Sequence, residues 1–327
     1  MYEPARGLGP RIALAALIAA LLILPPFLGS YTHFIVSLAL VNIIIAVGLN
    51  LLTGNAGQIS LCQSSFMAIG AYTTTYIHAK LGLTFWAALP MGGLFAALFG
   101  FALGFPALRL RGFYLAVVTL GFLEITQILI EELPSITGGV RGMHAPRPFL
   151  FGFKLAKDLH FYYVILGITL ASIWCARSLL ASPTGRAFNA IRNSEAAAQT
   201  LSVPLARIKL IAFVVAAFYA GIGGGLFASL AGFIDPLEFG VGTSIRHVVF
   251  IVFGGIGSIT GSVLGAAVLT VLPEMLRGFK EYNEFVYGAL LLIVLIVLPK
   301  GLVGLWPALR SRLGPRRGAG PLPGPAS

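Results

Sequence analysis

Charged side chains are scarce in this sequence, and their scarcity excludes an ordinary soluble protein. Only 10% of the 327 residues are Asp, Glu, Lys or Arg, whereas 57% are hydrophobic. Soluble domains carry about 25% charged residues, and a soluble chain of this length could not cover its surface with so few. The composition therefore indicates a protein that is surrounded by lipid.

Residue patterns typical of enzymes are also missing. The two cysteines, Cys62 and Cys175, lie in separate apolar segments and have no metal-ligand spacing. The sequence contains no H-E-x-x-H motif and no Ser/His/Asp-like grouping. It also lacks the phosphate-binding motif G-x-x-x-x-G-K-[ST], because no lysine follows a glycine. We therefore expect no catalytic residue, metal or cofactor in this chain, and any ATPase must be a separate polypeptide.

The few charges are mostly basic. The formal net charge is +11, but no aromatic-basic motif of RNA-binding proteins accompanies it, so we expect no nucleic-acid partner. Cytoplasmic loops of membrane proteins carry an excess of Lys and Arg. Placing both termini in the cytoplasm puts most of the Lys and Arg residues on that side, and this is the orientation that we predict.

Long apolar runs are abundant, whereas the short alternating strands of a β-barrel are missing. About 20 apolar residues cross a bilayer as a helix. The ten hydrophobic segments are 12–28, 34–52, 58–78, 85–105, 113–133, 161–180, 209–231, 243–257, 259–276 and 284–304. The sequence therefore predicts an all-α fold, a polytopic transmembrane helix bundle with 8–10 spans and with cytoplasmic N and C termini.

The chain has a simple domain organisation. We expect residues 1–11 to be a cytoplasmic segment, 12–305 the transmembrane domain, and 306–327, rich in Pro and Gly, a disordered cytoplasmic tail. The first apolar run could pass for a signal peptide, but no clear cleavage site follows it, so we expect a retained helix. The polar stretch 53–65 favours a broken or re-entrant backbone, and 243–276 is either one bent helix or two short ones.

The polar and basic loop 182–208 is the most informative stretch. Its residues 185–200 are amphipathic, and Pro204 ends the pattern. One apolar face of the predicted helix comprises Phe188, Ile191, Ala198 and Leu201, and Arg192 and Glu195 lie on another face. Such a helix either docks on a soluble partner or rests on lipid headgroups. The spacing alone favours neither alternative.

Polar side chains inside apolar segments are candidates for contact with a transported solute. Those in the second and third segments are Asn42, Asn50, Asn55, Gln58, Ser60 and Gln63. They either offer hydrogen bonds along a translocation path or join neighbouring helices. Glu124 is the one plausible acid within a span, and we expect it to pair with Arg246 or His247 or to reach a surface.

Glycines recur near the C-terminal end of the bundle. They include Gly254, Gly255, Gly257, Gly261 and Gly265. Small residues let helix backbones approach closely. Their role is either static packing or a hinge or shear surface for alternating access.

Several blocks resemble one known family. The triplet Glu195-Ala196-Ala197 resembles the cytoplasmic coupling motif of ABC importer permeases, and the wider run GRAFNAIRNSEAAA at 185–198 is similar to that of the LivM-type branched-chain amino acid permeases. The further matching blocks are GLNLLTGNAGQISL at 48–61, RLRGFYLAVVTL at 109–120, Thr137-Gly138-Gly139, GGIGS at 254–258 continuing to Gly265-Ala266, and Pro299-Lys300-Gly301-Leu302. The resemblance covers roughly residues 30–305.

The resemblance implies a bacterial inner-membrane importer. This chain and a second, LivH-like permease, identical or homologous, would form the pore. Two ABC ATPase subunits would sit beneath it, and a soluble periplasmic or extracellular binding protein would deliver the amino acid. The coupling residues would be Arg186, Arg192, Glu195, Ala196 and Ala197.

Other functions stay open at this point. An ion-coupled secondary transporter would show internal repeats and buried acids, and neither is evident. Departures from the family pattern, such as Ser202-Val203-Pro204 and Gln63-Ser64-Ser65, leave the substrate open. Urea, amides or aromatic acids are alternatives to branched-chain amino acids.

Overall fold

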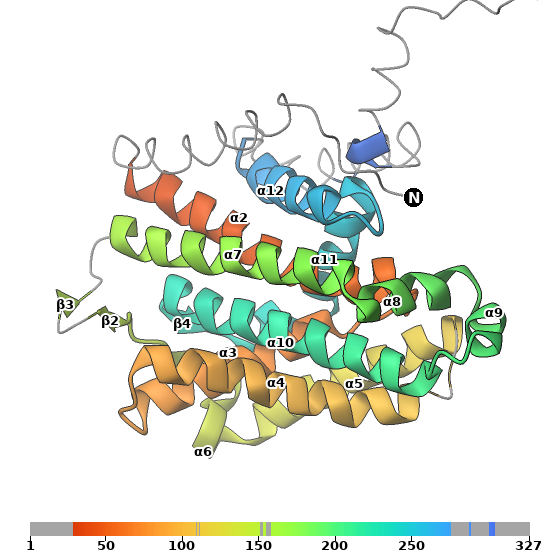
Figure 1. The fold of residues 1–327 in the computed structure, drawn as a ribbon. Coiled ribbons are helices and arrows are strands. Elements are labelled where there is room, and N and C mark those ends of the chain that lie inside the picture. The colour runs from red at the N-terminus through yellow and green to blue at the C-terminus, as the bar shows by residue number, and fades with distance from the viewer. Residues whose placement is uncertain are drawn as a thin grey trace, which may run out of the picture.

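A computed structural model shows a helical bundle and describes residues 29–108, 110, 112–150, 153–154, 158–275, 288 and 301–304 (Figure 1). The long helices are α2 (Ser30–Leu49), α3 (Gln63–Ala79), α4 (Phe85–Ala107), α5 (Phe113–Glu132), α7 (Asp158–Ala181), α10 (Leu205–Ala231), α11 (Val241–Gly254) and α12 (Ile259–Met275). The short elements are the π-helix η2 (Asn50–Asn55), α6 (Pro134–Thr137), η3 (Gly139–Arg141), α8 (Pro183–Asn193), α9 (Glu195–Thr200), η4 (Pro236–Phe239) and η6 (Leu302–Gly304). The predicted all-α bundle is confirmed.

Six helices in the described part of the chain are long and apolar enough to cross a membrane. They are Ser30–Asn55, Phe85–Ala107, Phe113–Glu132, Leu159–Ala181, Leu205–Ala231 and Pro236–Gly254. The helices α3 and α12 are shorter, with 17 residues each. Eight of the ten predicted segments thus fall on described helices. The segments 1–11, 12–28 and 306–327 and most of 284–304 lie outside the described residues, so the total number of spans and the placement of the termini stay predictions.

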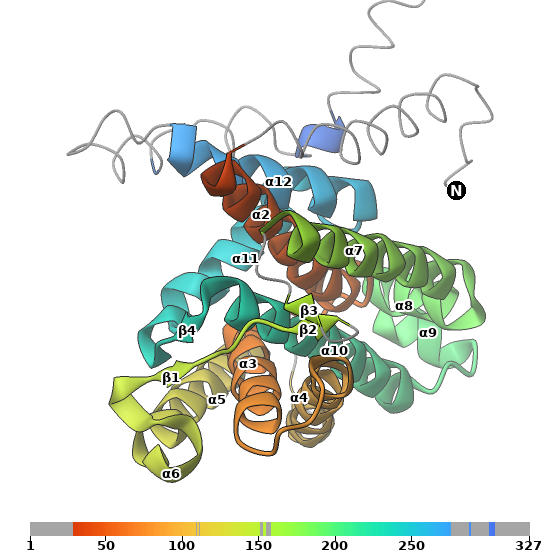
Figure 2. The same ribbon diagram turned by 90° about the vertical axis from the view of Figure 1, so that its left-hand side faces the viewer.

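Helix α10 lies at the centre of the bundle. Figures 1 and 2 show it between α3 and α4 on one side and α2 and α7 on the other. The approach is close because the facing residues are small: a Cβ atom on Gly224 would overlap the Met67 carbonyl oxygen, and one on Gly70 would overlap the Gly221 carbonyl oxygen. Packing of small residues stabilises helix pairs in lipid, where water does not drive association.

Two interruptions of the helices lie where the sequence is ambiguous. The backbone passes from α2 through the π-helix η2 into a non-helical stretch and resumes as α3 at Gln63, which confirms the predicted break. In the second ambiguous stretch, residues 243–276, α11 and α12 are two separate helices. The turn between them contains Gly255 at φ +121° and Gly257 at φ +85°, conformations that favour glycine.

Two pairs of short strands lie at one end of the bundle. Strand β1 (Met143–His144) pairs antiparallel with β4 (Phe233–Ile234), and β2 (Phe149–Leu150) pairs with β3 (Phe153–Lys154). The strand β4 leads through η4 into α11. Figure 1 shows β2, β3 and β4 at the end of the bundle opposite to α8 and α9.

Candidate functional site

The loop 182–208 folds as two short helices instead of the single predicted helix. The break is at Ser194, whose backbone is extended with φ −164° and ψ 114°. Its side-chain oxygen accepts a hydrogen bond of 3.2 Å from the Ala197 amide and so caps α9. The single helix was wrong because a serine that caps a new helix ends the preceding one.

The apolar face of this loop packs against the bundle. Three residues of the predicted apolar face, Phe188, Ile191 and Ala198, are no more than 3% exposed, whereas Leu201 is 75% exposed and does not belong to the buried face. Helix α8 contacts α7, α10 and η2. The remaining predicted coupling residues Arg186, Arg192, Ala196 and Ala197 are exposed.

Arg192 lies across two glycine turns that are far apart in the sequence. A Cβ atom on Gly57 would lie 3.3 Å from the Arg192 Cα, and a Cβ atom on Gly257 would overlap its guanidinium Nη1. Both glycines have positive φ, +69° and +85°. Arg192 of α8 thus contacts both the connection between η2 and α3 and the turn between α11 and α12.

Two asparagines fasten the turn at Gly257 to the π-helix. The Gly257 amide donates to Oδ1 of Asn50 over 2.8 Å, and Nδ2 of Asn55 donates to the Gly257 carbonyl over 3.3 Å. Both amides are buried. The contact of Arg192 with Gly257 therefore continues directly into η2 and α2.

Glu195 joins the loop to the central helix. Its carboxylate forms an ion pair with Lys209 at 2.5 Å, in the first turns of α10. The Lys209 side chain is only 4% exposed, so it needs this partner. Both α8 and α9 are consequently attached to elements that run through the bundle.

The other candidate path residues are engaged with the protein itself. Nε2 of Gln63 donates to the carbonyls of Ile45 and Ala216 and so bridges α2 and α10. Gln58 donates to the Ala56 carbonyl, and Ser60 lies 3.3 Å from the sulfur of Cys62. Among the described residues, Nδ2 of Asn50, Oδ1 of Asn55 and Oε1 of Gln63 are buried without a hydrogen-bond partner. Contact of these residues with substrate stays a prediction.

The candidate hinge glycines form a close helix contact. A Cβ atom on Gly254 would overlap the carbonyl oxygen of Gly261, and one on Gly265 would overlap that of Phe250. Helices α11 and α12 therefore pack backbone to backbone. Gly255 begins the turn that separates them. The packing is observed, and sliding along this contact stays a prediction.

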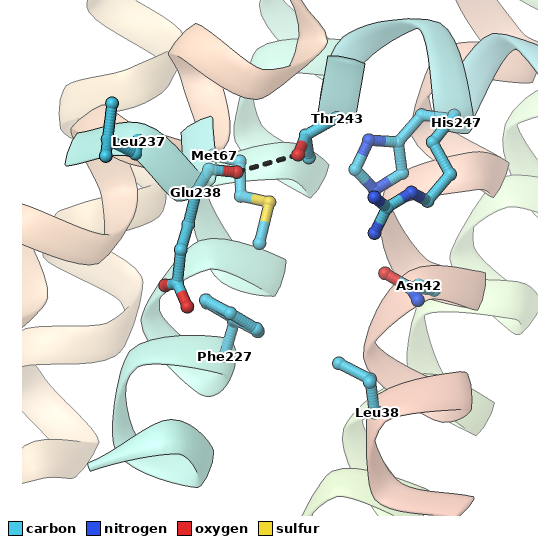
Figure 3. A pocket seen from close by; sticks show the side chains of 9 residues that line it. Leu38, Asn42, Met67, Phe227, Leu237, Glu238, Thr243 and His247 are labelled. Carbon is cyan, nitrogen blue, oxygen red and sulfur yellow. Dashed lines mark hydrogen bonds between the residues drawn. The ribbon is translucent and has the colours of Figure 1, made fainter. Parts of the chain in front are cut away.

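A cavity of about 290 Å³ lies between α2, α3, α10, η4 and α11 (Figure 3). Its polar lining comprises Asn42, Glu238, Thr243, Arg246 and His247. Its apolar lining comprises Leu38, Met67, Phe227 and Leu237. Figure 3 shows the Glu238 carboxylate and the His247 ring on opposite sides of the opening.

The sequence did not single out this cavity. Glu124 is exposed on α5, and in the part of the chain that the structure describes it forms no ion pair with Arg246 or His247, so that expected pairing is wrong. Glu238 and Thr243 were missed. The available signal was an acid and a base eight residues apart at the start of an apolar helix, in a chain with few charges.

Comparison with known families decides the class of this bundle. The family model for the permease component of branched-chain amino acid transport systems matches residues 31–295. The chain belongs to this family. The LivM-type resemblance of residues 185–198 and of the glycine blocks is thereby confirmed, and the protein is a multi-pass membrane protein.

Named relatives of this family member are permease proteins of import and transport systems. It is 37% identical to the high-affinity branched-chain amino acid transport system permease protein LivM of Escherichia coli K12, over 94% of this chain and 78% of that protein. It is 27% identical to LivH of Salmonella typhimurium, over 80% and 90%. It is also 27% identical to the autoinducer 2 import system permease protein LsrC of Enterobacter sp. 638, over 89% and 86%. No solved structure matches the chain.

Proposed function

We propose that this chain is a membrane-spanning permease subunit of an ATP-binding cassette importer that carries branched-chain amino acids into a bacterial cell across the inner membrane. The 37% identity to LivM over most of both chains supports the substrate class. The partners would be a second, LivH-like permease, two ABC ATPase subunits and a soluble substrate-binding protein outside the membrane. ATP hydrolysis would take place on the ATPase subunits.

The burial of the apolar face of α8 and α9 carries this proposal. A helix that merely rests on lipid headgroups turns its apolar face toward the lipid. Here Phe188 and Ile191 are buried against the bundle, and the exposed face is polar. This arrangement favours a soluble partner over headgroups as the surface that α8 and α9 meet.

Arg192 would transmit the motion of such a partner. A displacement of α8 pushes the guanidinium against Gly257, whose peptide is fastened to Asn50 and Asn55. Because packed elements move as units, the force would reach α2 through η2 and would also reach α11 and α12. The ion pair between Glu195 and Lys209 would carry it to α10.

Reconstitution tests the proposal. Vesicles containing this chain, its companion permease and the ATPases should take up leucine from a loaded binding protein only when ATP is present. Arg192→Ala should keep most ATP hydrolysis and lose most uptake, because the partner still turns over but its motion no longer reaches the bundle. Arg177→Ala, an exposed arginine on α7, is the matched control and should behave as wild type.

Two results would contradict the assignment. Uptake by this chain alone, driven by an ion gradient without any ATPase, would make it a secondary transporter. Normal uptake per ATP by Arg192→Ala would remove the coupling role of the contact with Gly257.

A further inference from the structure

We propose that the cavity between α2, α3, α10, η4 and α11 is a binding site for the zwitterionic head and aliphatic side chain of an amino acid. Glu238 would face the ammonium group, and Arg246 with His247 would face the carboxylate. This inference rests on the proposed import function and adds the place where the permease itself holds its substrate.

The charged residues of this cavity lie in a candidate membrane span, where charged side chains are energetically unfavourable. Glu238 and Arg246 lie in Pro236–Gly254, one of the candidate membrane spans, and both are exposed in the isolated chain. Among the described residues no ion pair joins them. Ionised groups inside a bilayer face a bundle interior or a water-filled path and mark the passage of a solute. A chain with so few charges has thus turned one of each sign toward a single hollow.

His247 gives independent evidence for a ligand. The residue is 1% exposed and lines the cavity. Apart from an interaction of the ring with the Thr243 backbone, neither ring nitrogen has a hydrogen-bond partner in the described part of the chain. Buried polar groups are nearly always hydrogen-bonded. A carboxylate in the cavity would accept a hydrogen bond from this ring.

Hydrogen bonds fix the residues on two sides of the cavity. The Thr243 hydroxyl donates to the Glu238 carbonyl over 2.7 Å and so fixes η4 against α11 (Figure 3). On α2, Nδ2 of Asn42 donates to Thr270 over 3.0 Å, which leaves the Asn42 oxygen as an acceptor. This oxygen could receive an ammonium hydrogen beside Glu238.

Size and apolar lining select the class of solute. Ligand pockets occupy about 300–1,000 Å³, so a cavity of about 290 Å³ suits a small molecule. Leu38, Met67 and Phe227 provide the apolar wall. Because a methionine side chain adapts to several shapes, this wall can accept Leu, Ile or Val side chains alike.

The position of the cavity fits its role in import. Its helix α11 begins just after η4, and η4 follows the strand β4, which lies at the end of the bundle opposite to α8 and α9 (Figure 1). The other end of α11 leads into the turn at Gly257, on which Arg192 rests. One helix therefore joins the charged cavity to the coupling loop, so a movement of that loop would reposition Arg246 and His247.

Binding of matched ligands to the full-length chain in lipid vesicles tests the site. The probes are leucine, 4-methylpentanoate, which lacks the ammonium, and 3-methylbutylamine, which lacks the carboxylate. Glu238→Gln should weaken leucine binding about 10- to 100-fold, the effect of losing one charge-assisted contact, and should leave 4-methylpentanoate unaffected. Arg246→Gln should weaken leucine equally and leave 3-methylbutylamine unaffected. The exposed residues outside the cavity supply the controls Glu124→Gln and Arg177→Gln, which should not change binding.

The outcomes separate this site from the import function. If the wild-type chain binds no leucine, or if both variants weaken all three probes alike, the proposed site is refuted. The site is also refuted if both variants bind the probes as the wild type does and merely reduce the amount of companion permease that copurifies. The charges of Glu238 and Arg246 would then serve assembly. If the complete wild-type transporter takes up leucine in an ATP-dependent way, the import function stands even when the proposed site is refuted. If the complete wild-type transporter shows no ATP-dependent uptake of leucine, the import function itself is refuted.

Discussion

Gly257 offers the sharpest test of the contact between Arg192 and the turn that joins α11 to α12. Its φ of +85° lies in the region that favours glycine, and a Cβ atom there would overlap Nη1 of Arg192. Gly257→Ala therefore strains the backbone and displaces the guanidinium. Gly232 is a matched control, because its φ is +77° and a Cβ atom would meet nothing within 4 Å.

The expected magnitudes follow from these two surroundings. An L-residue in the left-handed conformation costs about 1–2 kcal/mol, and this strain applies to both substitutions. Gly257→Ala also forces Arg192 from its rotamer, at about 0.5–1.5 kcal/mol. We expect Gly232→Ala to lower the free energy of unfolding by about 1–2 kcal/mol and Gly257→Ala to lower it by about 2–3 kcal/mol.

Two measurements check this reasoning. In the reconstituted transporter, the amount of leucine taken up per ATP hydrolysed should fall for Gly257→Ala and stay near wild type for Gly232→Ala. In denaturant unfolding, Gly257→Ala should cost less in an Arg192→Ala background than in the wild type, because the overlap with the guanidinium has gone. Equal uptake ratios for the two glycine variants, or additive stability losses in the cycle, would refute the contact.

Two further predictions concern the ion pair at the start of α10 and the centre of the bundle. Glu195→Gln should lower the free energy of unfolding by about 1–3 kcal/mol because Lys209 stays buried without its charge partner, and adding Lys209→Met should restore part of the loss in thermal unfolding. Gly224→Ala should lower the yield of monodisperse protein in size-exclusion chromatography, because its Cβ overlaps the Met67 carbonyl oxygen. Gly167→Ala on α7 meets no atom within 4 Å and should not.

These two predictions fail under different results. A double variant at positions 195 and 209 that is less stable than Glu195→Gln alone would mean that the lysine has another important partner. Equal yields for the Gly224→Ala and Gly167→Ala proteins would mean that α10 can move away from α3 at little cost.

The structure also changes how the loop 182–208 is understood. The sequence indicated an amphipathic segment but left open which surface its apolar face meets. Burial of Phe188 and Ile191 against the bundle answers this, since the face that could enter lipid is already used. The break at Ser194 then orients α8 and α9 separately, so Arg192 reaches Gly257 while Glu195 reaches Lys209.

The sequence by itself determined the helices of this protein. In lipid a backbone must satisfy its hydrogen bonds internally, so an apolar run of about 20 residues becomes a helix whatever its neighbours are. Segments 85–105 and 113–133 were accordingly observed as Phe85–Ala107 and Phe113–Glu132. The polar stretch 53–65 and the glycines near residue 255 marked the interruptions for the same reason.

Only the tertiary structure decided which side chains meet. Asn50 and Gly257 are 207 positions apart, and Gly57 touches Arg192 from a distant segment. The cavity likewise gathers Leu38, Phe227 and Glu238 from different elements. Such meetings depend on how closely and at what angle the helices pack, and helical periodicity within one segment carries no information about that.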